Sequence, residues 1–411
     1  MAGTAEFLIE SSEALVFGPP RSSTAGEAHR IESQFPPSPR AFQGMLRARL
    51  LHGADPPLDL ESGADNAEIE RLVGSPDRFP AGWQLRGPFP ALRLAVARGS
   101  LDAPKLQPWV PVPRFMLHAH GAALHAHEIR STHPGLSDLD LDGTRVSLLG
   151  RPEFGALKSM SGWVGPRNLL AALSGEGALD WDAEQWWRER PPFVHREIRP
   201  GLAVDGGTAT ARHGMLYFAG ALRFAAGSGL YGRLDARLDK RLDLSTLSHG
   251  AVQAGRKGRI AVLTPVEALD ADWQKIMNGS HLPAAVEDGA RFWLYALTPA
   301  RPDATPDRED ALGLARGGRL PAAVRVKLCA ALTGRPQVIG GYRLADRTPR
   351  PNLLYHPAGS AWLIELSGGS AEQRRDALHA LHDRHPLAPQ ADAAMGFGHT
   401  LVGIGPKIME G

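Results

Sequence analysis

The sequence predicts an α+β fold, with strands outnumbering helices and two domains sharing the 411 residues. Three observations carry this prediction. Residues 6–17 (EFLIESSEALVF) have the composition of an opening strand, and residues 35–51 (FPPSPRAFQGMLRARLL) predict an amphipathic helix that begins at a proline. The second half of the chain predicts mainly strands. A strand, a long loop and a helix, in that order, are also how a ferredoxin-like βαββαβ module begins.

Composition limits the class of protein. Hydrophobic residues make up 43% and charged residues 22% of the chain, which is normal for a soluble globular protein. The apolar runs are far shorter than a membrane span, and the N-terminus MAGTAEFLIE lacks both a basic leader and a signal-type apolar core. We therefore expect a cytoplasmic protein with no membrane partner. The single cysteine, Cys329, excludes internal disulfides and multi-cysteine zinc sites, and its apolar neighbours predict a core position.

The basic residues are strongly biased towards arginine. The formal net charge is only +2, but seven of the 46 basic residues are lysines and 39 are arginines. Arginine binds phosphate in a fork geometry and stacks on bases, so this bias suits RNA. A GC-rich genome gives the same bias whatever the function, and the abundance of Ala, Gly and Pro agrees with that alternative. The arginine count alone does not separate the two.

The helix expected after residue 38 is the sharpest local signal. Three prolines at 36, 37 and 39 keep the chain extended before the helix, where Ser38 is the expected N-cap and Pro39 the first helical residue. The apolar positions at helical spacing are Phe42, Met45, Leu46 and Leu50. The polar positions on the remaining surface are Arg40, Gln43, Arg47 and Arg49. This face, next to a helix N-terminus, suits a phosphate-rich partner, although an ordinary solvated face has the same pattern.

The other expected elements follow from local pattern. Helices are predicted at the following four segments: 161–175, 180–192, 230–244 and 370–382. Strands are predicted within the following segments: 195–205, 214–225, 259–266, 291–300, 338–344 and 353–366. Residues 191 and 192 are both prolines and mark a plausible boundary, which divides the chain into domains 1–190 and 191–411.

Segment 115–128 (FMLHAHGAALHAHE) raises the question of a metal site. Its two His-x-His pairs are His118 with His120 and His125 with His127. In a strand each pair projects from one face, as metal-ligating pairs often do. No carboxylate-rich or cysteine set reinforces the four imidazoles, so histidines at the surface or in contact with RNA are the alternative.

Two glycine-containing segments suit close approach by a phosphate backbone. The turn in AGRKGRIAVL carries Arg256, Lys257 and Arg259 with no acidic residue, although basic hairpin tips also occur in proteins that bind no nucleic acid. The terminal segment 396–405 (GFGHTLVGIG) is too close to the end of the sequence for a dinucleotide-binding unit, which needs a helix after the glycines. A glycine-rich loop that leads into a last strand remains the prediction.

Taken together, segments across nearly the whole chain resemble one family. They are VFGPPR, IESQFPPSPRAFQGMLRARLL, HREIRPGLAVD, ATARHGMLYFAGALRF, AGRKGRIAVL, PAGSAWLIEL and GFGHTLVGIG. The chain resembles the RAMP-superfamily subunit of the type III-B CRISPR Cmr effector complex that is third in the Cmr nomenclature. The resemblance implies two ferredoxin-like (RRM-like, RAMP) domains with inserted loops and hairpins.

The resemblance also implies a function without catalysis and without a cofactor. Such a subunit holds the 5′ handle of the CRISPR RNA, docks the large polymerase-like subunit and a backbone RAMP subunit, and meets target RNA only through the complex. The expected RNA-binding residues are Arg21, Ser38, Arg40, Gln43, Arg47, Arg49, Arg256, Lys257, Arg259, Gly396, Phe397, Gly398, His399 and Gly403. Two features depart from the family: Lys257 stands where an acidic residue is expected, and the double His-x-His segment is not typical.

Three alternatives stay open at this point. Relatives in the superfamily cleave precursor CRISPR RNA with a histidine in a metal-independent reaction, for which His29 is the candidate here. A metal hydrolase would use the four histidines of residues 118–127. A purely structural assembly protein would make no contact with RNA.

Overall fold

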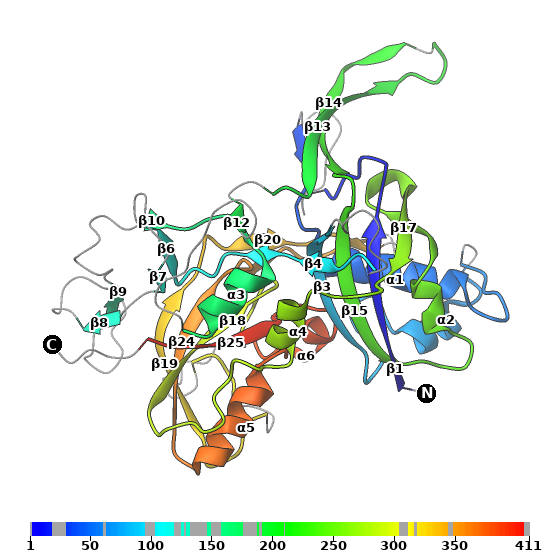
Figure 1. Cartoon of the computed structure of the whole chain (residues 1–411). Coiled ribbons are helices and arrows are strands. Elements are labelled where there is room, and N and C mark those ends of the chain that lie inside the picture. Colours follow the sequence, from blue (N-terminus) through cyan, green and yellow to red (C-terminus); the bar gives the residue numbers. More distant parts are fainter. Residues whose placement is uncertain are drawn as a thin grey trace.

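The computed structural model describes residues 2–18, 30–60, 63–94, 103–118, 125–126, 129–131, 146–148, 158–175, 187–188, 191–208, 210–303, 311–315, 319–343 and 348–406. Two antiparallel sheets form its frame, with helices on their faces (Figure 1). Within the described residues, no helix is both long and apolar enough to span a bilayer. The α+β class predicted from the sequence is confirmed.

The first sheet has six strands in the order β16-β17-β1-β15-β3-β4. Their bounds are β1 Ala2–Glu10, β3 Gln84–Arg93, β4 Leu106–Pro108, β15 Ser228–Arg237, β16 Gly250–Ala254 and β17 Arg259–Pro265. All neighbouring pairs are antiparallel, and Thr4 of β1 lies opposite Asp235 of β15. The sheet draws strands from both sides of residue 190, so a cut at that residue would divide one sheet between two fragments.

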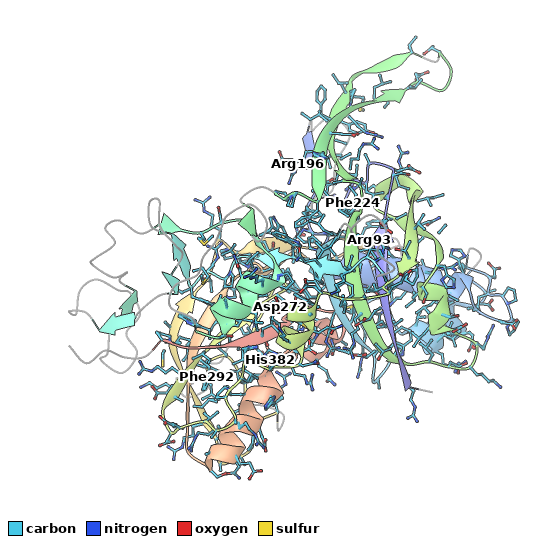
Figure 2. All side chains as sticks on the ribbon, viewed as in Figure 1. Arg93, Arg196, Phe224, Asp272, Phe292 and His382 are labelled. Atoms are coloured by element: carbon cyan, nitrogen blue, oxygen red, sulfur yellow. The ribbon has the colours of Figure 1, made fainter. Side chains whose placement is uncertain are left out.

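The second sheet has four strands in the order β19-β24-β18-β25. Their bounds are β18 Ala290–Ala296, β19 Arg325–Leu332, β24 Ala361–Ser367 and β25 Thr400–Ile404. Both faces of β18 are buried. Phe292 and Leu294 pack with Leu378 of helix α5 (Ala371–Leu381), whereas Trp293 and Tyr295 belong to the core on the other face. Figure 2 labels Phe292 on this sheet and His382 just beyond α5.

Two short helices lie where the sheets approach each other. Helix α3 (Pro166–Leu173) and helix α4 (Ala271–Met277) contribute Leu169 and Trp273 to one core that also holds Phe89 of the first sheet and Trp293 of the second. The polypeptide therefore folds as two sheets joined through a shared apolar layer (Figure 1).

Helix α1 (Pro39–His52) forms as the sequence predicts. The hydroxyl of Ser38 accepts a hydrogen bond from Ala41 N, and Pro39 occupies the first helical turn. Phe42, Met45, Leu46 and Leu50 are all buried against the first sheet. The ring of Phe42 lies over Gly232 of β15, where a Cβ atom would come within 2.6 Å of it, so the sheet needs glycine at this position.

A long hairpin projects from the first sheet (Figure 1). It consists of β13 (Val194–Val204) and β14 (Ala211–Phe224), and β14 also pairs in parallel with β2 (Arg30–Glu32). One face of the hairpin is apolar and exposed through Ile198, Leu202, Val204, Leu216 and Phe218. We call these five residues the hairpin face. Figure 2 labels Arg196 near the base of the hairpin.

The remaining elements are short. They are α2 Asn66–Val73, β5 Val110–Pro111, β6 Met116–His118, β7 His125–Ala126, β8 Ile129–Ser131, β9 Val146–Leu148, β10 Lys158–Ser159, β11 Trp163–Val164, β12 Trp187–Arg188, η2 Leu244–Leu247, η3 Arg256–Gly258, β20 Gln337–Ile339, β21 Tyr342–Arg343, β22 Thr348–Pro349, β23 Leu353–Tyr355 and α6 Gln390–Ala394.

One helix prediction was wrong, and a second is contradicted at the two residues of its segment that form a described strand. Segment 230–244 begins as strand β15, because Leu230, Leu234 and Ala236 also alternate at period two and pack into the core of the first sheet. In segment 180–192, Trp187 and Arg188 form strand β12, which pairs with β11, and most of that segment lies outside the described residues. The opening strand is also shorter than predicted, since β1 ends at Glu10.

Candidate functional site

The N-terminus of α1 and the terminal glycine loop meet in the structure. A Cβ atom added at Gly396 would lie 3.6 Å from Cβ of Pro39 and 3.1 Å from the carbonyl oxygen of Gly87. The φ of Gly396 is +103°, a backbone conformation that suits glycine. The guanidinium carbon of Arg40 lies 5.7 Å from the ring centroid of Phe397. Two segments that the sequence analysis singled out separately therefore form one site.

A buried carboxylate organises this site. Asp392 accepts hydrogen bonds from Arg40 Nη2 at 2.9 Å, from Arg301 Nη2 at 3.3 Å and from the hydroxyl of Tyr355 at 2.8 Å. Its side chain is only 7% exposed. Burial, followed by the charge of Asp392, raises the pKa of Tyr355, so its hydroxyl remains a donor.

A second carboxylate, that of Asp77, lies within ion-pair distance of three arginines at the surface. Asp77 lies 3.1 Å from Arg343, 3.9 Å from Arg40 and in direct contact with Arg350. Beside it, Arg47 donates to the carbonyl of Ser75 and places its guanidinium carbon 4.7 Å from the ring centroid of Phe79. We call the five residues Arg40, Arg47, Arg301, Arg343 and Arg350 the arginine cluster.

The arginine cluster crowds several positive charges together. Its five guanidinium groups gather around two carboxylates, those of Asp77 and Asp392. Burial, followed by repulsion from Arg350, lowers the pKa of Arg47 to about 10. Burial, followed by repulsion from Arg40, lowers the pKa of Arg350. Crowding of this kind favours a site that an anion completes.

Buried hydrogen-bond donors in the arginine cluster also favour an anion-binding site. Within the described residues, Nε of Arg40, Nε of Arg301 and both Nε and Nη2 of Arg47 are buried without a hydrogen-bond partner. Buried donors are normally satisfied, because leaving one unpaired costs about 1–3 kcal/mol. Arg301 and Arg343 remain 38% and 31% exposed and form the accessible side of the cluster.

The other expected RNA-binding residues lie elsewhere. At the turn before β17, Arg256 packs on Gly18 and Arg259 pairs with Glu13 at 2.8 Å. Arg49 donates to the carbonyls of Thr246 and His249 near the start of β16. Lys257 belongs to η3, but its side chain is not among those described. Arg21 and His29 lie outside the described residues.

Several of the expected contact residues are part of the core. Phe397 is fully buried and stacks on Tyr355 with ring centroids 4.9 Å apart, and Gln43 is also buried. His399 is fully buried with Nε2 2.8 Å from Oδ1 of Asp383. Gly398 and Gly403 approach Leu387 and Leu173 too closely for a side chain. In this structure these residues shape the site from within and present no side chain at its surface.

The histidine pairs fall largely outside the described residues. His118 ends β6 and His125 begins β7, which pairs with β6, but His120 and His127 and all four side chains are not described. Among the described residues there is no group of three or more His, Cys, Asp or Glu side chains arranged to hold a metal ion.

Sequence reasoning missed most of the partners in this site. Asp77, Arg301, Arg343, Arg350 and Asp392 lie in loops, at the end of a short strand or in a short helix. Only Arg343 lies in a segment for which an element was predicted, the strand at 338–344, and no local pattern marks any of the five as a site residue.

Comparisons with known proteins bear on the whole chain. A family model described as "CRISPR-associated protein (Cas_Cmr3)" matches residues 7–405. A search of curated proteins found no match. The chain is similar, at 16% identity and a TM-score of 0.43, to a chain in the cryo-EM structure of the Type III-B Cmr-beta bound to cognate target RNA and AMPPnP, state 1, covering 88% of this chain and 86% of that one. A chain of the same assembly bound to cognate target RNA matches with 16% identity, the same coverage and a TM-score of 0.41.

Proposed function

Because the chain belongs to the Cas_Cmr3 family of CRISPR-associated proteins, we propose that it is a non-catalytic subunit of a type III-B Cmr effector complex and binds the 5′ handle of the CRISPR RNA. The observation that carries this proposal is the arginine cluster. Its crowded guanidinium groups and the unpartnered buried donors of Arg40, Arg47 and Arg301 suit a chain of phosphates, and its exposed members Arg301 and Arg343 give that chain access.

The strand order supports two ferredoxin-like modules. In the second sheet, strands taken as first to fourth along the chain lie in the order 2-3-1-4, with α5 between the third and the fourth. In the first sheet, β1, β3, β15 and β17 follow the same order, with α1 after the first strand. Both strand orders match the ferredoxin-like arrangement. In the first module η2 stands in place of the second helix, and in the second module the described residues hold no helix between β18 and β19.

Protein partners are the second part of the proposal. The subunit docks the large polymerase-like subunit and a backbone RAMP subunit in the cytoplasm, and reaches target RNA through the complex. The hairpin face supports a protein contact, because five large apolar side chains are exposed on one projecting element.

The test is binding of the purified chain to labelled single-stranded RNA with the repeat-derived 5′ handle, against a scrambled RNA of equal length, over a salt series. We expect preference for the handle and a steep fall in affinity with salt. The double variant Arg301→Gln with Arg343→Gln should flatten the slope by roughly 1.4, since each lost phosphate contact removes about 0.7 for a single strand.

The matched control is Arg375→Gln on α5, whose side chain is 37% exposed and pairs with Asp376 at 3.2 Å. It should leave both the slope and the handle preference unchanged. Equal effects of the control and the double variant, or no handle preference in the wild type, would contradict the proposal.

A further inference from the structure

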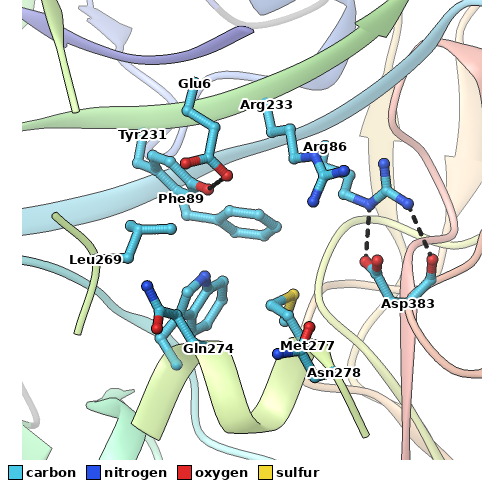
Figure 3. A pocket seen from close by; sticks show the side chains of 11 residues that line it. Glu6, Arg86, Phe89, Tyr231, Arg233, Leu269, Gln274, Met277, Asn278 and Asp383 are labelled. Atoms are coloured by element: carbon cyan, nitrogen blue, oxygen red, sulfur yellow. Dashed lines mark hydrogen bonds and ion pairs between the residues drawn. The ribbon is translucent and has the colours of Figure 1, made fainter. Parts of the chain in front are cut away.

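A pocket of about 260 Å³ lies between the first sheet and helix α4 (Figure 3). It is on the face of the sheet opposite α1, because Tyr231 points into it while its neighbour Gly232 faces Phe42 of α1. The sheet supplies Glu6, Phe89 and Arg233, and the helix supplies Gln274, Met277 and Asn278. The arginine cluster does not share any residue with this pocket.

Most of the charged groups at the pocket already have protein partners. Arg86 is held by Asp383 at 2.7 Å and by Asp235 at 2.5 Å. The hydroxyl of Tyr231 donates to Oε1 of Glu6 at 3.1 Å. Burial, followed by the charge of Glu6, raises the pKa of Tyr231 well above its ordinary value, so the hydroxyl stays a donor.

The groups that remain define the ligand. Among the described residues, Oε2 of Glu6 and the side-chain amides of Gln274 and Asn278 have no hydrogen-bond partner. In Figure 3, Arg233, whose Nε donates to Asp235 at 3.1 Å, approaches the pocket from the sheet, Met277 approaches from the helix and the ring of Phe89 closes the back. The space between a guanidinium and a thioether suits a flat ring with polar edges.

Size and hydrogen bonding narrow the choice. The volume is below the range of about 300–1,000 Å³ that is usual for drug-sized ligands, so the pocket suits a single ring system. A carboxylate accepts from the N4 amino group of cytosine or the N6 amino group of adenine, whereas it repels the O4 oxygen of uracil. We propose that this pocket binds one unpaired RNA base with an exocyclic amino group, and that Glu6 reads that group.

The pocket and the arginine cluster adjoin the same short segment. The ring of His399 lies 5.8 Å from the ring of Phe89 at the back of the pocket, and Phe397 lies under Arg40 of the cluster. The Cα atoms of residues two apart are separated by at most roughly 7 Å. Both side chains are fully buried, so this segment forms the wall between the two sites. The inference rests on the proposed function and adds base selectivity to it.

The test compares oligocytidine and oligouridine of equal length, each labelled with a fluorophore and titrated with the full chain at fixed ionic strength. These pyrimidines have the same size and differ at the edge that Glu6 would meet. We expect oligocytidine to bind about tenfold more tightly, as one good contact to a base edge provides. Glu6→Gln should bring the two affinities within about twofold, because the amide donates to O4 of uracil as well as accepting.

The sign of the Glu6→Gln effect separates base reading from general electrostatics. If the pocket only repels phosphate, removing the carboxylate strengthens binding of both oligonucleotides equally and the cytidine preference, if any, persists. The control Lys275→Gln changes a charge on the same helix, but this side chain pairs with Asp272 and does not line the pocket. Lys275→Gln should either leave the affinity for both oligonucleotides unchanged or lower both affinities by the same factor.

Each outcome decides between the two proposals. Equal binding of both oligonucleotides by the wild type, or a preference that survives Glu6→Gln, overturns the base pocket and leaves RNA binding by the arginine cluster standing. No binding of either oligonucleotide overturns both. Thermal unfolding of each variant establishes that it is folded. In the Glu6→Gln variant, the hydroxyl of Tyr231 can still donate to the oxygen of the new side-chain amide, as it does to the carboxylate.

Discussion

Arg86 of β3 donates from Nε to Oδ1 of Asp383 at 2.7 Å, and this ion pair ties the first sheet to the turn that follows α5. The same carboxylate oxygen lies 2.8 Å from Nε2 of His399. Asp383 adopts a φ of +51°, a region that few residues other than glycine occupy, so the turn is shaped to present this carboxylate. One largely buried charge therefore links the two sheets beside their shared apolar layer.

Removing the arginine of this pair should destabilise the whole chain. Arg86→Met removes the closer of the two cations beside the buried Asp383 and leaves only Arg384 at 3.9 Å, and breaking a buried pair in this way costs about 3–5 kcal/mol. Urea unfolding followed by circular dichroism measures the loss. Arg71→Gln is the control, because Arg71 is 53% exposed and pairs with Glu68 at the surface. A similar midpoint shift in both variants would count against a special role for Arg86.

Stability should fall as the pH drops from 7 to 5. Nε2 of His382 donates to the carbonyl of Ile276 at 2.7 Å and Nδ1 accepts from Val402 N at 3.1 Å, so the neutral ring is fully used. Burial lowers the pKa of His382 to about 4 in the folded state, from the ordinary 6.5. Below pH 6.5 the imidazole of His382 is protonated in the unfolded chain but stays neutral in the folded chain. Lowering the pH therefore favours unfolding.

This linkage amounts to about 2 kcal/mol between pH 7 and pH 5 for His382 alone. Burial also lowers the pKa of His385 and of His399, so these residues add to the loss in the same direction. The measurement is the urea midpoint at several pH values. His382→Gln is less stable at pH 7 but should lose less between pH 7 and 5, and an equal loss in variant and wild type would contradict the assignment.

Asp392→Asn should have opposite effects on stability and on RNA binding. The amide keeps the shape but removes the charge that Arg40 and Arg301 share, and we expect unfolding to become easier by about 3 kcal/mol. The loss of this negative charge also makes the arginine cluster more positive, so folded protein should bind single-stranded RNA more tightly. Weaker binding by a variant with a native circular dichroism spectrum would argue against the cluster as the phosphate site.

The hairpin face should matter for assembly and not for folding. Leu202 and Phe218 are 51% and 39% exposed, so replacing both with serine removes little buried area and should change stability by less than about 0.5 kcal/mol. Co-purification with the other Cmr subunits should be lost. Ala203→Ser, which points to the other side of the same strand, is the control and should co-purify as the wild type does.

The elements that the sequence predicted well are those with several independent local signals. Helix α1 has a capping serine, a proline at the first turn and four apolar residues at helical spacing, and all of these act in the structure. Strand β15 was missed because its leucines satisfy both a helical and an alternating spacing, and pairing with β1 and β3 decides between them. Local pattern cannot reveal that pairing.

Only part of the candidate site could be predicted from the sequence. Arg40 stood out because it lies on a helix with other arginines, whereas Asp392, its ion-pair partner, is 352 residues away in a short helix with no charge pattern. The meeting of α1 with the glycine loop is likewise a tertiary result, since it depends on how the two sheets pack. Spacing along the chain contains no information about such contacts.

The pairing of β1 with β15 has a consequence for synthesis. Thr4 hydrogen-bonds to Asp235, which is 231 residues later in the chain. At about 5–20 residues per second, the ribosome releases β1 roughly 10–50 seconds before its central partner emerges. During that interval an apolar strand with Phe7, Leu8 and Ile9 has neither neighbour, so the nascent chain presents a surface that a chaperone would have to shield.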